Sequence, residues 1–321
     1  MEKVLITGGT GFLGSNIAKR LINENYEIYA TYHTQKPIYP ISGVKYINVN
    51  LLEISQCMNI MENIDIVIMC AAYVGGIAAI NCKPLDLLNN STRINLNTLE
   101  AAYENGIKKC IFISSGAVYP KLNCKAKEEY AFIGNPIEKY YVLGWTKRFG
   151  EILCNMYAEK VNKKIDITVL RIDNIYGPYD TFEGNKAHVI PSLIKKVVNN
   201  DDPILVWGNG EEKKDFLYVE DLVEAILLCI KRTKDFNCYN VVSGKNRTIN
   251  EVLQMIMDIC NSKNNIKYDL SKPTSISERN LDNSKIRFEL GFKSHTELYD
   301  GLVKTILWYK KEHKINIGEN I

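Results

Sequence analysis

The sequence predicts an α/β fold with a doubly wound parallel sheet, and three observations support this prediction. Short runs of apolar and β-branched residues alternate, up to Ile172, with longer segments of helical spacing. A glycine-rich segment joins the first such run to the first helical segment. From Tyr176 to about Lys214 the alternation gives way to a stretch rich in Gly, Pro, Asn and Lys. Alternation of this kind places helices on both faces of one parallel sheet, and its loss indicates a second lobe.

The expected strands are short and rich in β-branched and aromatic residues, and they cover Lys3 to Thr7, Glu27 to Tyr32, Val44 to Val49, Asp65 to Cys70, Lys109 to Ser114 and Asp166 to Ile172. Apolar residues at helical spacing predict the intervening helices at Leu13 to Asn23, Leu85 to Glu104 and Thr146 to Lys160. Because helical crossovers connect parallel strands, the sheet is expected to be parallel.

A smaller C-terminal lobe is expected to begin near Tyr176. Beyond it the pattern predicts a helix, a strand and two more helices, at Val219 to Ile230, Cys238 to Val242, Asn250 to Cys260 and Leu298 to His313. We assign residues 1–175, rejoined by about 216–245, to the core. Residues 176–215 and 246–321 are assigned to the lobe.

Composition and charge narrow the class of protein. Apolar residues make up 46% of the 321 residues and charged residues 24%, as in soluble globular proteins. The net charge of +3 and the lack of a long basic run argue against nucleic acid and membrane partners. The N-terminus leaves no room for a signal peptide and no apolar run suits a membrane span, so we expect a cytoplasmic protein. The nine scattered cysteines predict reduced thiols, and we expect no metal site.

The segment Thr7-Gly8-Gly9-Thr10-Gly11-Phe12-Leu13-Gly14 joins the first strand to the first helix. Backbone N–H groups and the helix dipole can hold a pyrophosphate there, and glycines let the chain turn sharply beside the anion. A plain tight turn is the alternative, but the position between a strand and an amphipathic helix favours a dinucleotide. We therefore predict a Rossmann-type core with the cofactor at Gly8, Thr10, Gly11, Phe12, Leu13 and Gly14.

The spacing of Gly8, Gly11 and Gly14 is G-x-x-G-x-x-G, which resembles the extended short-chain dehydrogenase/reductases, the NAD-dependent epimerase/dehydratase family. The resemblance implies that four residues after the third and fourth strands line the adenine and the nicotinamide ribose, namely Asn50, Leu51, Ala71 and Ala72.

The end of the second strand bears on the choice of cofactor. An acid there would bind the adenosine ribose of NAD, but the chain reads Thr31-Tyr32-His33-Thr34-Gln35-Lys36. Because His33 and Lys36 can attract a 2′-phosphate that an acid would repel, we expect NADP (NADPH) in preference to NAD. The alternative is that both are ordinary loop residues.

The catalytic segment of the family is matched except at its tyrosine. The resemblance places Ser115, at the end of the fifth strand, where its hydroxyl stabilises the alkoxide formed by hydride transfer. Without the resemblance, Ser115 is equally a turn former or a helix cap. The family's Tyr-x-x-x-Lys pattern falls on Leu143 and Lys147. Lys147 fits as a ligand of the nicotinamide ribose, but Leu143 has no proton to give.

The proton donor therefore stays open. Tyr141 is our first choice over Tyr140, because Gly144 weakens helical order and a distorted helix start can bring either ring into the site. A water held by Ser115 and Lys147 is the second alternative. The third is a protein that binds cofactor without catalysis, since loss of a positioned general acid costs about 10² to 10⁴ in rate.

Further motifs resemble those of GDP-L-fucose synthase and related nucleotide-sugar reductases within this family: Ala71 to Ile77, Asn174 to Pro178, His188 to Pro191 and Val206 to Gly210. The match implies that Asn174 and His188 face the sugar, His188 as a catalytic residue, and that Trp207 packs near the base. It also implies that Lys196, Lys214 and Arg279 meet the diphosphate. The plainer alternatives are a core tryptophan, solvated lysines and a histidine that merely precedes a helix.

In the same resemblance, a cysteine that serves epimerisation falls on Ala117. Loss of one acid/base partner disables deprotonation and reprotonation next to a ketone while hydride transfer stays possible. We therefore predict NAD(P)H-dependent reduction, without epimerisation, of a 4-keto-6-deoxyhexose carried on dTDP or GDP. The 6-deoxy sugar would serve a surface polysaccharide of the O-antigen (lipopolysaccharide) type.

Two other functions stay open. One is a nucleotide-sugar epimerase or dehydratase that retains its NAD, and the other is a noncatalytic cofactor-binding protein. The family also implies a homodimer through the helices Leu85 to Glu104 and Thr146 to Lys160.

Overall fold

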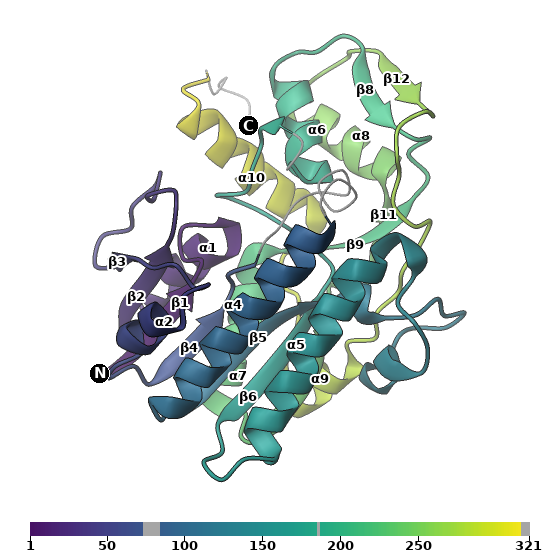
Figure 1. The fold of residues 1–321 in the computed structure, drawn as a ribbon. Helices are drawn as coiled ribbons and strands as arrows, with labels where there is room; N and C mark the ends of the chain where they lie inside the picture. Colours follow the sequence, from purple (N-terminus) through teal and green to yellow (C-terminus); the bar gives the residue numbers. More distant parts are fainter. Residues whose placement is uncertain (73–83, 185–186, 316–321) are drawn as a thin grey trace.

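The computed structural model describes residues 1–72, 84–184 and 187–315. Within these residues, seven parallel strands form the main sheet in the order β10-β6-β5-β4-β1-β2-β3 (Figure 1). The strands are β1 (Glu2–Thr7), β2 (Tyr26–Tyr32), β3 (Lys45–Asn48), β4 (Ile66–Met69), β5 (Lys109–Ser115), β6 (Asp166–Ile172) and β10 (Phe236–Val241). The order reverses between β1 and β4, which is the switch point where doubly wound sheets bind their ligands. The predicted Rossmann-type α/β fold is confirmed.

Helices cover both faces of this sheet because successive strand residues point to opposite sides. Val4 and Ile6 of β1 pack on one side against α1 (Phe12–Leu21), α7 (Val219–Arg232) and α9 (Ser284–Leu290). Leu5 packs on the other side, which α2 (Ile54–Ile60), α4 (Pro84–Glu104) and α5 (Tyr141–Glu159) cover. Figure 1 shows α4 and α5 side by side in front of the sheet.

A smaller group of elements lies over the carboxyl ends of the strands (Figure 1). It contains α6 (Val189–Val198), β8 (Ile204–Trp207), α8 (Ile249–Ile259), β12 (Ile266–Asp269) and α10 (Leu298–Glu312). A three-stranded sheet of β7 (Asn174–Tyr176), β9 (Lys213–Tyr218) and β11 (Asn246–Thr248) joins it to the main sheet. These elements share an apolar core of their own, in which Ile194, Val206 and Ile256 are buried.

The stretch from Tyr176 to Lys214 is more regular than its Gly, Pro, Asn and Lys content suggests. It contains α6 and β8, whose apolar residues fill the core of the smaller group. In α6, Ile190, Leu193, Ile194 and Val197 recur at helical spacing and are buried. Polar residues at the ends of these short elements conceal the periodicity within them.

Helix α9 packs with the larger group, although it lies in the segment 246–321 that we assigned to the smaller lobe. Its Ile286 and Leu290, followed by Phe292, join the core beneath β10 and α7. None of the helices in the described ranges combines the length and the apolar character needed to cross a membrane.

Candidate active site

A cavity of about 410 Å³ lies between the carboxyl edge of the main sheet and the smaller group of elements. From the main sheet it is lined by the serine segment after β5, by the start of α5 and by the residues that follow β6. From the other side it is lined by residues of α6, β8 and β9. It therefore brings together Ser115, Asn174, His188, Lys196, Trp207, Lys214 and Arg279.

The glycine turn between β1 and α1 makes a cradle that side chains would block. Gly8 has a φ of +66°, and a Cβ on Gly14 would lie 2.4 Å from the carbonyl oxygen of Gly8. The Gly8 N–H donates to Thr31 Oγ1 at 3.0 Å, which fixes the turn against β2. Helix α1 begins at Phe12, so Thr10 and Gly11 precede its first turn, which contains Leu13. The cradle and the helix N-terminus fit a dinucleotide pyrophosphate.

Four further residues, Asn50, Leu51, Ala71 and Ala72, were predicted to line the cofactor. Ala71 lies beside Gly8, and its N–H donates to Thr7 Oγ1 at 3.1 Å. The N–H of Leu52 donates to Asn50 Oδ1 at 3.1 Å, and Leu51 is buried beside them. Ala72 follows Ala71 and is partly exposed. Part of the predicted motif, Tyr73 to Ile77, lies outside the described residues.

The loop after β2 carries His33 and Lys36, and both are exposed. The amide of Asn48 donates to the carbonyl oxygen of His33 at 2.7 Å, which ties this loop to β3. The end of β2, from Thr31 to Lys36, holds no carboxylate. No negatively charged side chain in these six residues would repel a 2′-phosphate.

Ser115 ends β5 and caps the short helical turn Gly116–Val118. Its Oγ accepts a hydrogen bond from the N–H of Ala117 at 3.1 Å, and the residue lines the cavity. Because this bond uses a lone pair of the hydroxyl, the hydroxyl hydrogen stays available to a substrate oxygen.

A buried polar network lies behind the serine segment. Arg171 of β6 donates to Glu151 of α5 through Nε at 3.0 Å and Nη2 at 2.7 Å. Arg171 Nη1 also donates to Tyr119 Oη at 2.9 Å, and Tyr119 donates to Asn240 Oδ1 at 2.7 Å. Ser114 donates to Glu151. Sequence reasoning missed this network, although a charged residue within an apolar strand signals a buried partner.

Lys147 of α5 reaches the carboxyl edge of the sheet. Its Nζ donates to the carbonyl oxygen of Ile113 at 2.7 Å and lies 5.2 Å from the ring centre of Phe112. Burial lowers the pKa of its ammonium group to about 8. Lys147 therefore offers a desolvated cation between β5 and α5, where a ribose hydroxyl could accept its protons.

The start of α5 differs from the expected distorted helix. A 3-10 turn covers Glu138–Tyr140, and a regular helix begins at Tyr141. Gly144 serves close packing, because a Cβ there would lie 2.5 Å from the carbonyl oxygen of Ala117.

Tyr141, our first choice as proton donor, and Tyr140 are placed differently relative to the cavity. The ring of Tyr141 packs edge-on against Trp145, 41% of the residue is exposed, and it does not line the cavity. Tyr140 lines the cavity with Leu143.

The lysines of the cavity are partly or fully buried. Lys214 donates to Ser275 and, at 3.0 Å, to the carbonyl oxygen of Ile276, and burial lowers its pKa to about 8. Lys196 Nζ donates to the carbonyl oxygen of Leu205 at 2.6 Å, and burial lowers its pKa as well. These lysines are therefore held in place rather than solvated.

Trp207 is 43% exposed at the rim, so it is not a core tryptophan. The ammonium nitrogen of Lys272 lies 5.9 Å from the centre of its ring system. An exposed flat ring beside a cation at the mouth of a cavity is suited to stack with a planar base.

His188 precedes α6, and its imidazole does not cap the helix. Its Nδ1 lies 3.2 Å from Oδ1 of Asp180, a buried carboxylate, while 54% of the histidine side chain is exposed. The hydrogen bond to Asp180 raises the pKa of His188. The imidazole therefore has an anchored nitrogen and a second nitrogen free for a ligand. Sequence reasoning missed Asp180.

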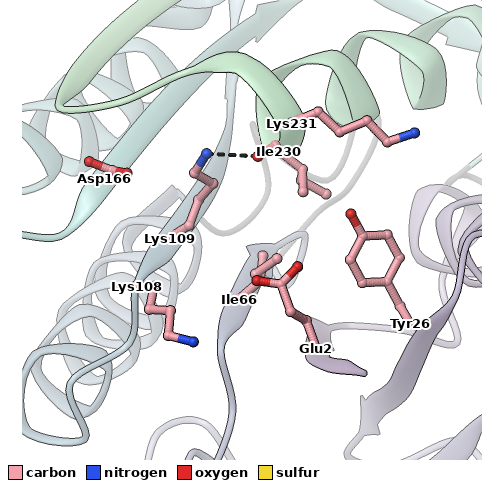
Figure 2. Close-up of a pocket in the computed structure, with 8 residues that line it drawn as sticks. All are labelled: Glu2, Tyr26, Ile66, Lys108, Lys109, Asp166, Ile230 and Lys231. Atoms are coloured by element: carbon pink, nitrogen blue, oxygen red, sulfur yellow. Dashed lines mark hydrogen bonds between the residues drawn. The ribbon is translucent and has the colours of Figure 1, made fainter.

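A second hollow lies at the opposite, amino end of the sheet (Figure 2). Lys109 Nζ donates to the carbonyl oxygen of Ile230 at 2.7 Å and thereby caps the end of α7, and Lys108 pairs with Asp65. Ligands of doubly wound sheets bind at the carboxyl ends of the strands, so we place the site in the other cavity.

Comparison with known proteins adds to this geometry. The model of the NAD dependent epimerase/dehydratase family matches residues 4–242. The chain is 29% identical over 315 residues to a putative GDP-L-fucose synthase 2 of Arabidopsis thaliana, covering 96% of this chain and 91% of the relative. It is 30% identical over 319 residues to a GDP-mannose 3,5-epimerase 1 of Oryza sativa subsp. indica, covering 97% and 82%.

Solved structures share the fold over nearly the full chain. A UDP-N-acetylglucosamine 4-epimerase from Methanobrevibacter ruminantium, in complex with UDP-N-acetylmuramic acid, has a TM-score of 0.85 at 27% identity and covers 97% of this chain and 99% of its own. A UDP-glucose 4-epimerase from Thermotoga maritima, with UDP-glucose, has a TM-score of 0.88 at 24% identity, with coverage of 97% and 99%. The second likeness bears on the fold alone.

Proposed function

Because the chain belongs to the NAD dependent epimerase/dehydratase family, we propose that it reduces a nucleotide-linked 4-keto-6-deoxyhexose at C4 to the 6-deoxy sugar. The main support for the proposal is that one cavity is lined by Ser115, Lys196, Lys214 and Arg279. The nicotinamide cofactor, when bound, supplies the hydride.

We assign the other catalytic roles to residues of this chain. The hydroxyl of Ser115 donates to the carbonyl oxygen and stabilises the negative charge that develops on it. Lys147 holds the nicotinamide ribose. Tyr140, which lines the cavity where Tyr141 does not, is our candidate proton donor.

The substrate lies across the cavity in this proposal. Lys196, Lys214 and Arg279 meet the diphosphate, because a desolvated anion needs buried cations. Trp207 stacks with the base, and Asn174 and His188 face the sugar. The relatives named as acting on GDP-sugars support GDP as the carrier, and dTDP remains the other candidate.

We further propose NADP as the preferred cofactor. The absence of a carboxylate from Thr31 to Lys36 and the exposed His33 and Lys36 support this preference. NAD is the alternative, and several solved structures of similar fold are complexes with NAD. The ratio of kcat/KM for NADPH to that for NADH decides between them.

A homodimer through α4 and α5 is also part of the proposal. The large apolar side chains that these adjacent helices expose include Leu96, Phe149, Ile152 and Met156. An exposed apolar surface on two packed helices favours pairing with a second copy. We propose that this enzyme acts in the cytoplasm and supplies a surface polysaccharide of the O-antigen type. Light scattering of the wild type and of Phe149→Glu tests the dimer.

The second candidate function is epimerisation with a retained nicotinamide. The relative named as a GDP-mannose 3,5-epimerase favours it, and so does the anchored acid/base pair of His188 and Asp180. Ala117 at the cavity wall disfavours inversion by deprotonation and reprotonation next to a ketone, because that route needs a second acid/base group.

The decisive experiment mixes the protein with NADPH and a 4-keto-6-deoxyhexose on GDP or dTDP, and follows nicotinamide absorbance and products. Loss of one NADPH for each 6-deoxy sugar formed supports the reductase and identifies the nucleotide. An isomerised sugar without loss of NADPH supports the epimerase. An untouched sugar, with NADPH bound, supports the noncatalytic alternative.

A further inference from the structure

Arg279 is held between a carboxylate and an aromatic ring at the wall of the cavity. Its Nη2 lies 3.2 Å from Asp173 Oδ1, and its guanidinium carbon lies 5.2 Å from the ring centre of Tyr140. The side chains of Arg279 and Asp173 are only 14% and 6% exposed. Because the pair is largely removed from water, its charges act on their neighbours with little screening.

The carboxylate of Asp173 is fixed next to the serine segment. Asp173 follows β6, whose last residue, Ile172, pairs with Ser115 of β5. A Cβ built on Gly116 would lie 3.4 Å from Asp173 Oδ1, so the carboxylate lies against the residue after Ser115. Asp173 and Ser115 both line the cavity. Asp173, which holds Arg279, therefore lies at the end of the cavity where Ser115 is proposed to bind the carbonyl oxygen of the substrate.

Tyr140 ends the 3-10 turn Glu138–Tyr140 directly before α5, and it lines the cavity together with Leu143, three residues later. It is largely buried, and it lines the same cavity as Ser115. No other tyrosine at the start of α5 lines this cavity in the described part of the chain, because Tyr141 faces away from it.

We propose that Asp173 and Arg279 are positioning residues that make Tyr140 the proton donor of this cavity. This inference rests on the proposed reductase function and names the donor's supporting residues. A cation over the face of an aromatic ring is attracted to it, and the attraction grows when the ring carries the negative charge of a phenolate. Asp173 holds the cation there.

The step balances with a reduced nicotinamide as the hydride source, which would become oxidised, and with solvent as the source of the proton that is consumed. Hydride adds to C4 of the keto sugar, and the electron pair of the carbonyl bond moves to oxygen. The Tyr140 O–H bond breaks and gives its proton to that oxygen, which leaves the phenolate beside Arg279. A proton from solvent then restores the phenol.

Other charged groups face this pair from every element around it. Lys214 of β9, Lys139 of the 3-10 turn, and Lys196 and His188 at α6 add positive charge, whereas Glu212 before β9 and Asp215 within it are acidic. Among the described residues, the Nε of Arg279 is buried without a hydrogen-bond partner. Arg279 is distinguished from the other cations by its contact with the Tyr140 ring.

The first test is the turnover of Arg279→Gln. We expect its kcat to fall, because the Tyr140 ring then lacks the cation that holds it in the cavity. Arg279→Lys should restore part of kcat, because it returns a cation without the planar guanidinium. An unchanged kcat in Arg279→Gln overturns the proposal.

The double variant Asp173→Asn/Arg279→Gln tests the anchoring role of Asp173. If Asp173 acts by holding Arg279 on the ring, the double variant should have about the same kcat as Arg279→Gln alone. If the losses of the two single variants add, Asp173 acts independently of Arg279 and the anchoring role is wrong. Glu297→Gln is the matched control, because it breaks an exposed ion pair with Lys245 outside the cavity.

The second test removes the phenol. Tyr140→Phe should lower kcat by about 10² to 10⁴, and Arg279→Gln added to it should lower kcat little further. A rise in KM for the nucleotide sugar at an unchanged kcat in Arg279→Gln would assign Arg279 to the diphosphate alone. A wild type that turns over no sugar contradicts the proposed function, whereas an active Tyr140→Phe contradicts the assignment of Tyr140 as the proton donor and leaves the reductase function standing. Circular dichroism of each variant checks its folding.

Discussion

Arg171 and Glu151 are joined by two hydrogen bonds, of 3.0 and 2.7 Å, between β6 and α5 in the interior of the protein. Both side chains are at least 96% removed from solvent, with 4% and 3% exposed. The pair ties the helix that carries Lys147 to the sheet that carries Ser115. It therefore fixes the distance between two groups that the proposed reaction needs at one site.

Loss of one partner of this pair should destabilise the fold strongly. Glu151→Ala leaves the Arg171 cation buried without its carboxylate, and we expect the free energy of unfolding to fall by about 3 to 5 kcal/mol. Urea denaturation measures it. Asp65→Asn is the matched control, because the exposed pair of Asp65 and Lys108 should contribute about 1 kcal/mol or less. Equal losses in the two variants would contradict a structural role for the buried pair.

The glycine cradle should not accept a single methyl group. In Gly14→Ala the new Cβ would lie 2.4 Å from the carbonyl oxygen of Gly8. The turn must then shift, and we expect NADPH binding to be lost, as measured by quenching of nicotinamide fluorescence. Gly134→Ala is the control, since its Cβ would meet nothing nearer than 3.5 Å. If Gly14→Ala bound NADPH with wild-type affinity, the cofactor would not bind at this turn.

The fold was predictable because its signals are local. The glycine turn and the apolar runs of β1 and β4 required no knowledge of distant contacts, and the parallel sheet is confirmed. The family resemblance, carried by spaced motifs, is confirmed as well. A helix start after His188 was expected, as α6 confirms, but the strand β8 was missed because the Asn, Asp and Gly around it conceal a short apolar pattern. Short elements provide too few residues for periodicity to be recognised.

The sequence offers candidates for the site only where a motif names a residue. A motif named Ser115 and Lys147, whose roles stay predictions, and no motif decides between Tyr140 and Tyr141. Adjacent residues differ by about 100° around a helix, so the residue at which α5 begins decides which ring faces the cavity. The pairing of Asp173 with Arg279 joins segments more than 100 positions apart, and no local pattern encodes it.

Cofactor affinity should depend on pH through Lys147. Burial lowers the pKa of its ammonium to about 8, so this lysine loses its charge as the pH rises through that value. If its cation holds the nicotinamide ribose, NADPH binding weakens above about pH 8, and turnover falls with it. In Lys147→Ala, binding is weaker at every pH and loses this dependence. Isothermal titration calorimetry from pH 6.5 to 9.5 measures the NADPH affinity of the wild type and of Lys147→Ala. Unchanged activity in Lys147→Ala would show that Lys147 does not belong to the site.

The free energy of unfolding should also depend on pH through Lys147. It should rise with pH, whereas cofactor affinity falls. Because the folded state lowers the pKa from 10.5 to about 8, the unfolded chain binds the proton more tightly. The contribution of Lys147 to stability therefore rises between about pH 8 and pH 10.5. Comparison of the wild type with Lys147→Met by urea denaturation isolates this contribution, and a parallel pH dependence of the two would contradict it.

Asp180 should set the titration of His188. The hydrogen bond between them raises the pKa of the imidazole, so Asp180→Asn lowers that pKa. The sign follows because the carboxylate stabilises the protonated imidazole, and this stabilisation is lost when the ring loses its proton as the pH rises. NMR titration of the four histidines tests it, with His33, His295 and His313 as internal controls. A midpoint of His188 that does not move would show that the carboxylate only orients the ring.

Tyr141→Phe tests the orientation of the first turn of α5. The Tyr141 ring packs on Trp145 outside the cavity, so removal of its hydroxyl should leave kcat and KM of the reduction within about twofold of the wild type, a change of roughly 0.4 kcal/mol in the barrier. Tyr140→Phe, which makes the same chemical change one position earlier, should lose most of the rate. The contrast between two adjacent tyrosines separates position from chemistry, because the variants have the same composition and differ only in the face of the helix that they alter. A large loss in Tyr141→Phe with an active Tyr140→Phe would return the proton donor to Tyr141 and would require the first turn of α5 to rotate when substrate binds.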